Sequence, residues 1–364
     1  MNRFTRYRLS RVITILITWL IFAFVIAVHE ALFLENFDGI YESEYLADYT
    51  FTKTLLAGLS TTFIGALAIG FLEEVYFRDR LKKLAFGRIV VLKTLIYSLF
   101  LVVLTILGSL VFNGIAVGKS ILDPIVIEAM LDYASSGGFW NTIIILLFAI
   151  LFTIIGLQIF DKFGPGVFWK FVTGRYHDTA EEDRAFMFLD MRSSTQIAEK
   201  LGHKKYFRML NDFFSDITNP IMENNGEIYQ YVGDEVVLCW KKADYRYLFT
   251  CFAAITGLIN SRTDYYGSEY GFVPEFKAGC HGGKVTVGEV GVIKREIVYT
   301  GDVLNTAARI QGMCNQLNSD FLVSEALVDS VPVGFESEEM GDIELRGKNE
   351  LVRLFKIKNC DKED

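Results

Sequence analysis

The chain lacks the features that mark several common classes of protein. Its five cysteines include no Cys-x-x-Cys pair and all lie in the second half, which argues against a zinc site or a disulfide framework and suits a reducing cytosol. Its formal net charge is -8 over 364 residues, whereas a general nucleic-acid binder needs clustered basic residues to displace counterions from phosphates. We therefore expect no nucleic-acid partner, and any polyanion that the chain binds should be small and metal-bound.

Charged residues are also missing from four long apolar runs in the first half. The chain is 51% hydrophobic and its mean hydropathy is +0.30, which is too apolar for an ordinary soluble protein. The runs cover residues 12–28, 54–72, 94–112 and 140–160. Each reaches or approaches the ~20 residues that a membrane-spanning helix needs. The first run is followed by no small-residue cleavage site, so we expect it to be retained, and residues 1–160 to form a four-helix transmembrane domain.

Basic residues predict the orientation of this domain. Four arginines precede the first run and six basic residues separate the second and third, whereas the 33–53 loop is acidic. Because positive residues stay in the cytoplasm, we expect both termini there, and the 33–53 and 113–139 loops outside the plasma membrane. Glu73 and Glu74 fall where the second helix should leave the bilayer, so we expect them at the interface. The runs carry no charge in their middle and include no proline-broken pair, which disfavours a transporter.

The rest of the chain predicts a connector over residues 161–183 and a soluble α+β domain over residues 184–358. The connector starts with a helix-stopping Gly-Pro-Gly segment. The later part predicts strands ending at Asp190 and over 276–281, 284–290 and 296–300, helices over 195–223, over 245–260 and from residue 303, and a hairpin around Gly233. This order indicates a ferredoxin-like sheet with helices on one face.

Two aspartates stand at positions that suit a metal site. Asp190 ends the apolar run of residues 185–189, and Asp234 occupies the hairpin tip between two runs rich in β-branched and aromatic residues. A carboxylate at a strand end and one in a hairpin turn can converge on Mg²⁺, which leaves coordination positions for substrate phosphates. The pair therefore predicts phosphoryl chemistry.

Four motifs in a fixed order strengthen this prediction. They are Phe-Leu-Asp at 188–190, Tyr-Val-Gly-Asp at 231–234, Phe-Lys-Ala-Gly-Cys-His-Gly-Gly at 276–283 and Gly-Asp-Val-Leu-Asn-Thr-Ala-Ala-Arg at 301–309. Together they resemble the catalytic domain of class III nucleotidyl cyclases, the adenylate and guanylate cyclases, over residues 184–358. The resemblance implies that Asp190 and Asp234 hold two Mg²⁺ or Mn²⁺ ions per active site. It also implies that Asn305 orients the ribose and that Arg309 stabilises charge on the reacting phosphate.

The resemblance further implies a dimer. In such cyclases each active site takes its metal aspartates from one catalytic domain and its Asn and Arg from another. Because this chain carries both sets, we expect a homodimer with two equivalent sites, held together in the lipid bilayer by the membrane helices. Arg346 and Lys348 fall where the family keeps a phosphate-contacting basic residue, and either could serve.

Two positions depart from the family pattern for reading the purine. Gln230 stands where adenylate cyclases usually have Lys, and Val298 stands where they usually have Asp or Thr. Neither matches the usual guanylate cyclase residues. Gln230 can donate and accept hydrogen bonds, so we expect ATP to be preferred, with loose selectivity or with help from Glu296 or Tyr299 in a shifted register.

We therefore expect a membrane-anchored adenylate cyclase that converts ATP to 3′,5′-cyclic AMP and pyrophosphate. The alternatives are a guanylate or loosely selective purine nucleotide cyclase and an inactive cyclase-like dimerisation module. A diguanylate cyclase is disfavoured because Val232 stands where that family has Gly. In addition, the helix that carries Asn305 and Arg309 would be unexplained.

Overall fold

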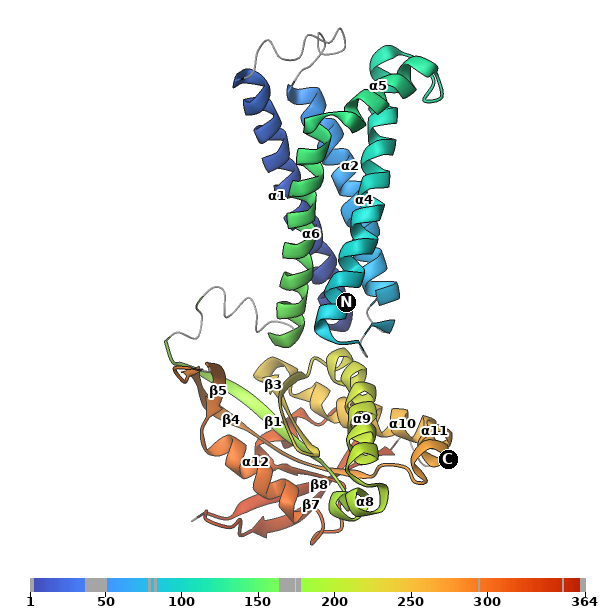
Figure 1. The fold of residues 1–364 in the computed structure, drawn as a ribbon. Helices are drawn as coiled ribbons and strands as arrows, with labels where there is room; N and C mark the ends of the chain where they lie inside the picture. Colours follow the sequence, from blue (N-terminus) through green and yellow to red (C-terminus); the bar gives the residue numbers. More distant parts are fainter. Residues whose placement is uncertain are drawn as a thin grey trace. The chain divides into compact units, whose positions relative to one another are not determined.

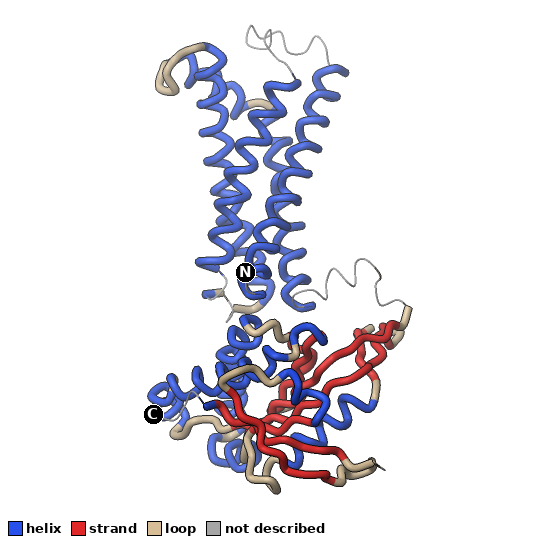
Figure 2. Tube along the Cα trace, turned by 180° about the vertical axis from the view of Figure 1, so that it is seen from behind, coloured by secondary structure: helices blue, strands red, loops and turns tan. Residues whose placement is uncertain are grey.

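The fold comes from a computed structural model, which describes residues 3–36, 51–77, 80–81, 84–163, 174, 178–293, 295–348 and 350–360. The chain forms two compact units, one of residues 6–163 and one of residues 164–364 together with the first five residues (Figure 1). Most of the expected connector and residues 37–50 of the first expected loop lie outside the described residues. The first described unit is entirely helical and the second is mixed (Figure 2).

Four long helices make up the first unit, as the apolar runs predict. The helices are α1 (Arg3–Asn36), α2 (Phe51–Leu72) with its π-helical continuation η2 (Glu73–Phe77), α4 (Phe86–Val117) and α6 (Gly137–Phe163). Each contains a stretch long and apolar enough to cross a membrane. A further helix, α5 (Pro124–Ser135), lies in the 113–139 segment and was not expected. Asp123 caps it by accepting from the backbone N–H of Ile125 at 3.0 Å, with proline in the first turn.

Glu73 and Glu74 are buried among the helices of this unit. Their exposed fractions are 1% and 7%. Tyr97 Oη donates to Glu73 at 2.6 Å and Lys93 pairs with the same carboxylate, while Arg11 Nε lies 2.9 Å from Glu74. Carboxylates in an apolar bundle need cationic partners, and here α1 and α4 supply them. Sequence spacing could not reveal this, because the partners come from other helices.

An eight-stranded sheet organises the second unit. The strands are β1 (Ala180–Met191), β2 (Glu227–Val232), β3 (Glu235–Lys241), β4 (Phe276–Val290), β5 (Glu296–Thr300), β6 (Phe321–Ser324), β7 (Phe335–Ile343) and β8 (Val352–Asn359). Their order is β2-β3-β1-β4-β6-β8-β7, and β5 pairs with β4. Only β4 and β6 run parallel among the strand pairs of the described residues. The two runs expected at 276–281 and 284–290 form the single strand β4, which continues through Gly282 and Gly283.

Helices cover both faces of this sheet, whereas the sequence predicted one covered face. The helices are α8 (Ser194–Leu201), α9 (His203–Glu223), α10 (Arg246–Ser261), α11 (Thr263–Tyr270) and α12 (Asp302–Met313), with short 3₁₀ turns at Lys242–Asp244 and Glu325–Ser330. Met187 of β1 packs in the core under α9 and α10, while its neighbour Phe186 packs against Val303 and Ala307 of α12 (Figure 1). Successive strand residues point to opposite faces, so the unbroken apolar run of β1 buries both. The helix expected over 195–223 is divided at Gly202, whose φ is +72°.

Candidate active site

The hairpin between β2 and β3 presents Asp234. Gly233 has a φ of +62°, which glycine adopts without steric cost and other residues adopt rarely. Gly233 and Asp234 form the two-residue turn, since Val232 and Glu235 are paired across the ladder. The turn therefore places the Asp234 carboxyl at the end of the sheet, as predicted.

Asp190 lies near the end of β1, in a row of charged residues that crosses three strands. It is paired with Glu235 on β3 and with Lys277 on β4. Because Asp234 directly precedes Glu235, the register brings the two aspartates together, close enough for the Asp234 carboxyl to raise the pKa of Asp190. The structure thus unites the two residues that the sequence assigned to a metal site.

Two residues that the sequence analysis missed hold the Asp190 carboxylate. Gln311 Nε2 donates to Asp190 Oδ2 at 2.7 Å, and Lys277 Nζ lies 3.5 Å from the same oxygen. Lys277 stands on β4 within the third motif, so its register opposite Asp190 was a usable signal. Gln311 had no such signal, because it reaches Asp190 from a helix 121 positions away in the sequence.

The electrostatics of this cluster suit a divalent cation. Burial and the neighbouring Asp234 carboxyl raise the pKa of Asp190, while the Lys277 ammonium opposes the rise. Burial, Asp190 and Asp234 together raise the pKa of Glu235 to about 7. A divalent cation between the aspartates would relieve this repulsion, so the residues fit the expected ion. Two carboxylates would leave coordination positions on Mg²⁺ open for phosphates and water. Among the described residues no group of three or more His, Cys, Asp or Glu side chains is placed to hold a metal ion.

Asn305 and Arg309 lie on α12, on a different face from Gln311. Residues four apart on an α-helix are separated by about 40° around its axis, so Asn305 and Arg309 share a face. Gln311 follows Arg309 by two residues and points about 200° away from it. Because Gln311 contacts the Asp190 of its own chain, Arg309 faces away from that carboxylate. In the described part of the chain no hydrogen bond or ion pair joins Arg309 to either aspartate.

A basic pair assembles at the start of α12. Lys348 Nζ lies 2.9 Å from Asp302 Oδ2, which keeps the pKa of Asp302 below its usual range. A Cβ on Gly347 would lie 3.5 Å from Arg309 Nη2, so the guanidinium lies beside the same turn. Arg346 is exposed, with no ion pair in the described residues. Lys348 is therefore held at the first turn of α12 through Asp302, and Gly347, which separates the two basic candidates, is the residue beside Arg309.

Comparison with known proteins identifies the second unit. The family model described as the adenylate and guanylate cyclase catalytic domain matches residues 177–358, half of the chain. The chain belongs to this cyclase family. Adenylate cyclase 2 of Rhizobium meliloti (strain 1021) is 32% identical over 206 residues, which cover 55% of this chain and 57% of the relative. The adenylate cyclase of Anabaena cylindrica is 25% identical over 220 residues, covering 56% and 43%. The chain thus spans about half the length of these relatives.

A solved structure shares the cyclase fold. A bacterial light-regulated adenylyl cyclase aligns with a TM-score of 0.52 at 18% identity, covering 62% of this chain and 66% of that chain. Together with the family match, this confirms the expected fold, a class III nucleotidyl cyclase catalytic domain that follows four apolar helices.

The expected purine-reading positions of the cyclase domain lie on β2 and β5. Gln230 follows a bulge in β2 and is exposed, and half-buried Val298 pairs with Gly288 of β4. Their sequence neighbours touch, since the rings of Tyr229 and Tyr299 lie 5.2 Å apart. Tyr299 is buried and packs in the sheet core, so it has little surface to offer a base.

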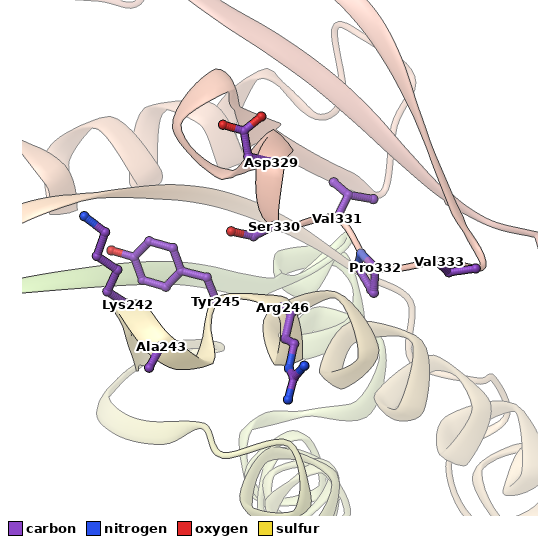
Figure 3. A pocket seen from close by; sticks show the side chains of 9 residues that line it. All are labelled: Lys242, Ala243, Tyr245, Arg246, Asp329, Ser330, Val331, Pro332 and Val333. Carbon is purple, nitrogen blue, oxygen red and sulfur yellow. The ribbon is translucent and has the colours of Figure 1, made fainter.

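One hollow of the cyclase domain lies away from these residues. It measures about 480 Å³ and is lined by Lys242, Ala243, Tyr245, Arg246 and residues 329–333 (Figure 3). It contains none of the expected site residues.

Proposed function

We propose that the chain is a membrane-anchored adenylate cyclase, which forms 3′,5′-cyclic AMP and pyrophosphate from ATP at sites shared by two copies. The reaction joins the ribose 3′-oxygen to the α-phosphorus, breaks the bond from that phosphorus to the pyrophosphate oxygen and releases the 3′-hydroxyl proton to solvent. The family match, the relatives named adenylate cyclase and the four candidate spans support this proposal. The basic residues around the spans support cytoplasmic termini and a cytoplasmic catalytic domain.

Each proposed site residue has a chemical role. Asp190 and Asp234 hold Mg²⁺ or Mn²⁺, two ions per site, which would lower the pKa of the attacking hydroxyl and stabilise the leaving pyrophosphate. Asn305 orients the ribose through an amide that can donate and accept. Arg309 brings a fixed, delocalised positive charge to the reacting phosphate, where the transition state develops negative charge. Lys348 contacts the phosphates, a role supported by its ion pair with Asp302 at the start of α12 and by the position of its neighbour Gly347 beside Arg309.

The observation that carries the shared site is the division of α12 into two faces. Gln311 donates a hydrogen bond to the Asp190 of its own chain, so Arg309, on another face of α12, points away from the aspartates of that chain. A second copy related by two-fold symmetry can place its own Arg309 and Asn305 opposite Asp190 and Asp234. The same operation completes the other site, which yields two equivalent sites per homodimer.

Differently tagged chains, co-expressed and purified in tandem, test the shared site. Asp190→Ala homodimers lose a metal ligand, and Arg309→Ala homodimers should lose roughly 10²–10³-fold in rate, because a preorganised charge is removed. A heterodimer of the two carries both lesions in one site and neither in the other, so it should regain about half of wild-type activity. Exposed Asp329→Ala and Arg353→Ala chains, paired in the same way, are the matched controls and should stay fully active. A heterodimer as inactive as its parents would place both residue sets within one chain.

The substrate is tested by product identity. The full-length chain in lipid nanodiscs is incubated with Mn²⁺ and either ATP or GTP, and the product is identified by mass. Cyclic AMP as the main product is expected. Cyclic GMP alone would identify a guanylate cyclase, and no product from either nucleotide would favour the inactive dimerisation module.

A further inference from the structure

Gln311 is a buried amide aimed at a proposed metal ligand. Its side chain is 8% exposed, and its Nε2 donates to Asp190 Oδ2 at 2.7 Å. A buried amide without a partner would be costly, so this hydrogen bond is the one that its burial requires. Nothing in the roles assigned to Asn305 and Arg309 explains a third polar residue on α12 that faces the opposite way.

The packing of α12 on β4 determines where Gln311 stands. Gly279 of β4 faces the helix directly, and a Cβ added there would lie 2.0 Å from the backbone N of Gln311. Three residues on, Cys314 Sγ donates to Ala278 O at 3.4 Å. The glycine thus admits the helix backbone to contact distance, and the end of α12 is held in register with β4. The packing of α12 on β4 therefore fixes the backbone of Gln311 independently of the contacts that its side chain makes.

Two donors meet on one oxygen of the Asp190 carboxylate. Gln311 Nε2 donates a hydrogen bond to Oδ2 at 2.7 Å, and Lys277 Nζ lies 3.5 Å from the same oxygen. A carboxylate offers about four lone-pair sites on its two oxygens, so Oδ1 keeps its capacity for a cation. Two donors from different elements also restrict rotation of the carboxylate about its Cβ–Cγ bond. The arrangement is that of a ligand oriented by outer hydrogen bonds.

We infer that Gln311 is a positioning residue of the cyclase site, which orients the Asp190 carboxylate of its own chain for cation binding. The inference rests on the proposed function, because it takes Asp190 as a metal ligand. It goes beyond that function by assigning to α12 a second task. One face of the helix acts in the site across the dimer, and the other prepares the metal ligand in the site of its own chain.

Direct Mn²⁺ binding provides a test that needs no turnover. Full-length wild type, Gln311→Met and Gln316→Met chains in nanodiscs are titrated with Mn²⁺ alone, and free ion is measured by electron paramagnetic resonance. Gln311→Met keeps an unbranched side chain of similar length but has no donor, so it should weaken binding by roughly 10- to 100-fold. Gln316 is exposed just beyond α12 and its replacement should leave binding unchanged. Equal affinity in all three chains would overturn the inference. If Gln311→Met is recovered only unfolded, the same titration is made on Gln311→Asn, whose amide remains polar but is one methylene too short to donate to Asp190.

Mixed dimers separate positioning from damage to the helix. In the heterodimer of Arg309→Ala and Asp190→Ala chains, the complete site uses the Asp190 of the Arg309→Ala chain. Gln311→Met added to that chain should raise the Mn²⁺ concentration for half-maximal activity by roughly 10- to 100-fold. Added instead to the Asp190→Ala chain, it has no carboxylate to orient and should change nothing. Equal effects from both placements would show a structural role and overturn the inference. An inactive parent heterodimer would instead count against the shared site, and the Mn²⁺ titration would still decide the role of Gln311.

Discussion

His281 should make the catalytic domain lose stability between pH 6.5 and pH 4. It stands on β4 with Nδ1 2.6 Å from Ser324 Oγ. Burial, and then the Lys348 ammonium, lower its pKa from 6.5 to about 4, against a smaller opposing effect of Asp302. The folded state therefore favours neutral imidazole, while the unfolded chain takes up a proton near pH 6.5. The stability that this histidine contributes is complete above pH 6.5 and is lost as the pH falls toward 4.

The size of the effect follows from the two pKa values. At about 1.4 kcal/mol for each pH unit, lowering from 6.5 to about 4 corresponds to about 3 kcal/mol, lost in full below pH 4. At pH 5.5 the unfolded imidazole is mostly charged and the folded one is not, which costs about 1 kcal/mol relative to pH 7.5. Carboxylates also titrate in this range. The quantity to compare is therefore the change in unfolding free energy between the two pH values, in wild type and in a variant without the imidazole.

Hydrogen exchange of β4 peptides in the full-length chain measures this difference. The free energy of opening is obtained at pH 7.5 and 5.5, with intrinsic exchange rates corrected for pH, for wild type and His281→Asn. The asparagine amide can keep a hydrogen bond to Ser324 but does not titrate. Wild type should lose about 1 kcal/mol more than the variant between the two pH values. His203→Gln removes an exposed histidine at the start of α9 and controls for loss of an imidazole. If wild type and His281→Asn lose the same free energy, burial does not hold His281 neutral.

Three further outcomes are expected. Gln230→Lys should change the ratio of kcat/KM for ATP to that for GTP, because a charged partner discriminates more strongly than a neutral amide; an unchanged ratio would remove residue 230 from the base site. Lys348→Ala should raise KM for the nucleotide more than Arg346→Ala does, measured by initial rates, since half-buried Lys348 is fixed by its ion pair with Asp302 of α12 whereas Arg346 is exposed; the opposite ranking would make Arg346 the phosphate contact. Cysteine labels in intact cells should react in the 113–139 segment and stay protected at 78–88, whereas the reverse would separate the catalytic domain from cytoplasmic ATP.

The parts of the fold that the sequence predicted are those decided by local patterns. Uncharged runs of about 20 residues permit only a spanning or deeply buried helix, and all four form long helices. The hairpin follows in the same way from Gly233-Asp234 between two β-rich runs. Its register against β1 then brings Asp234 to Asp190, as the motifs predicted.

Contacts between distant elements account for most of what the sequence analysis missed. The burial of Glu73 and Glu74 could not be predicted from their own segment, because the cations that pair with them stand on α1 and α4. The position of α12 on the face opposite α9 was missed because an apolar run such as β1 does not say which helix covers which side.

By itself the sequence determined the helical first half, the order of the cyclase motifs and the residue types available for metal and phosphate. These depend on composition and short spacing, which each segment carries independently of its neighbours. Only the tertiary structure decided that Lys277 and Gln311 share one oxygen of Asp190, that Lys348 rather than Arg346 pairs with Asp302 of α12, and that Arg309 turns away from its own aspartates. Those outcomes depend on how a helix is rotated against a sheet. That rotation is set by close packing at positions such as Gly279, which no local pattern encodes.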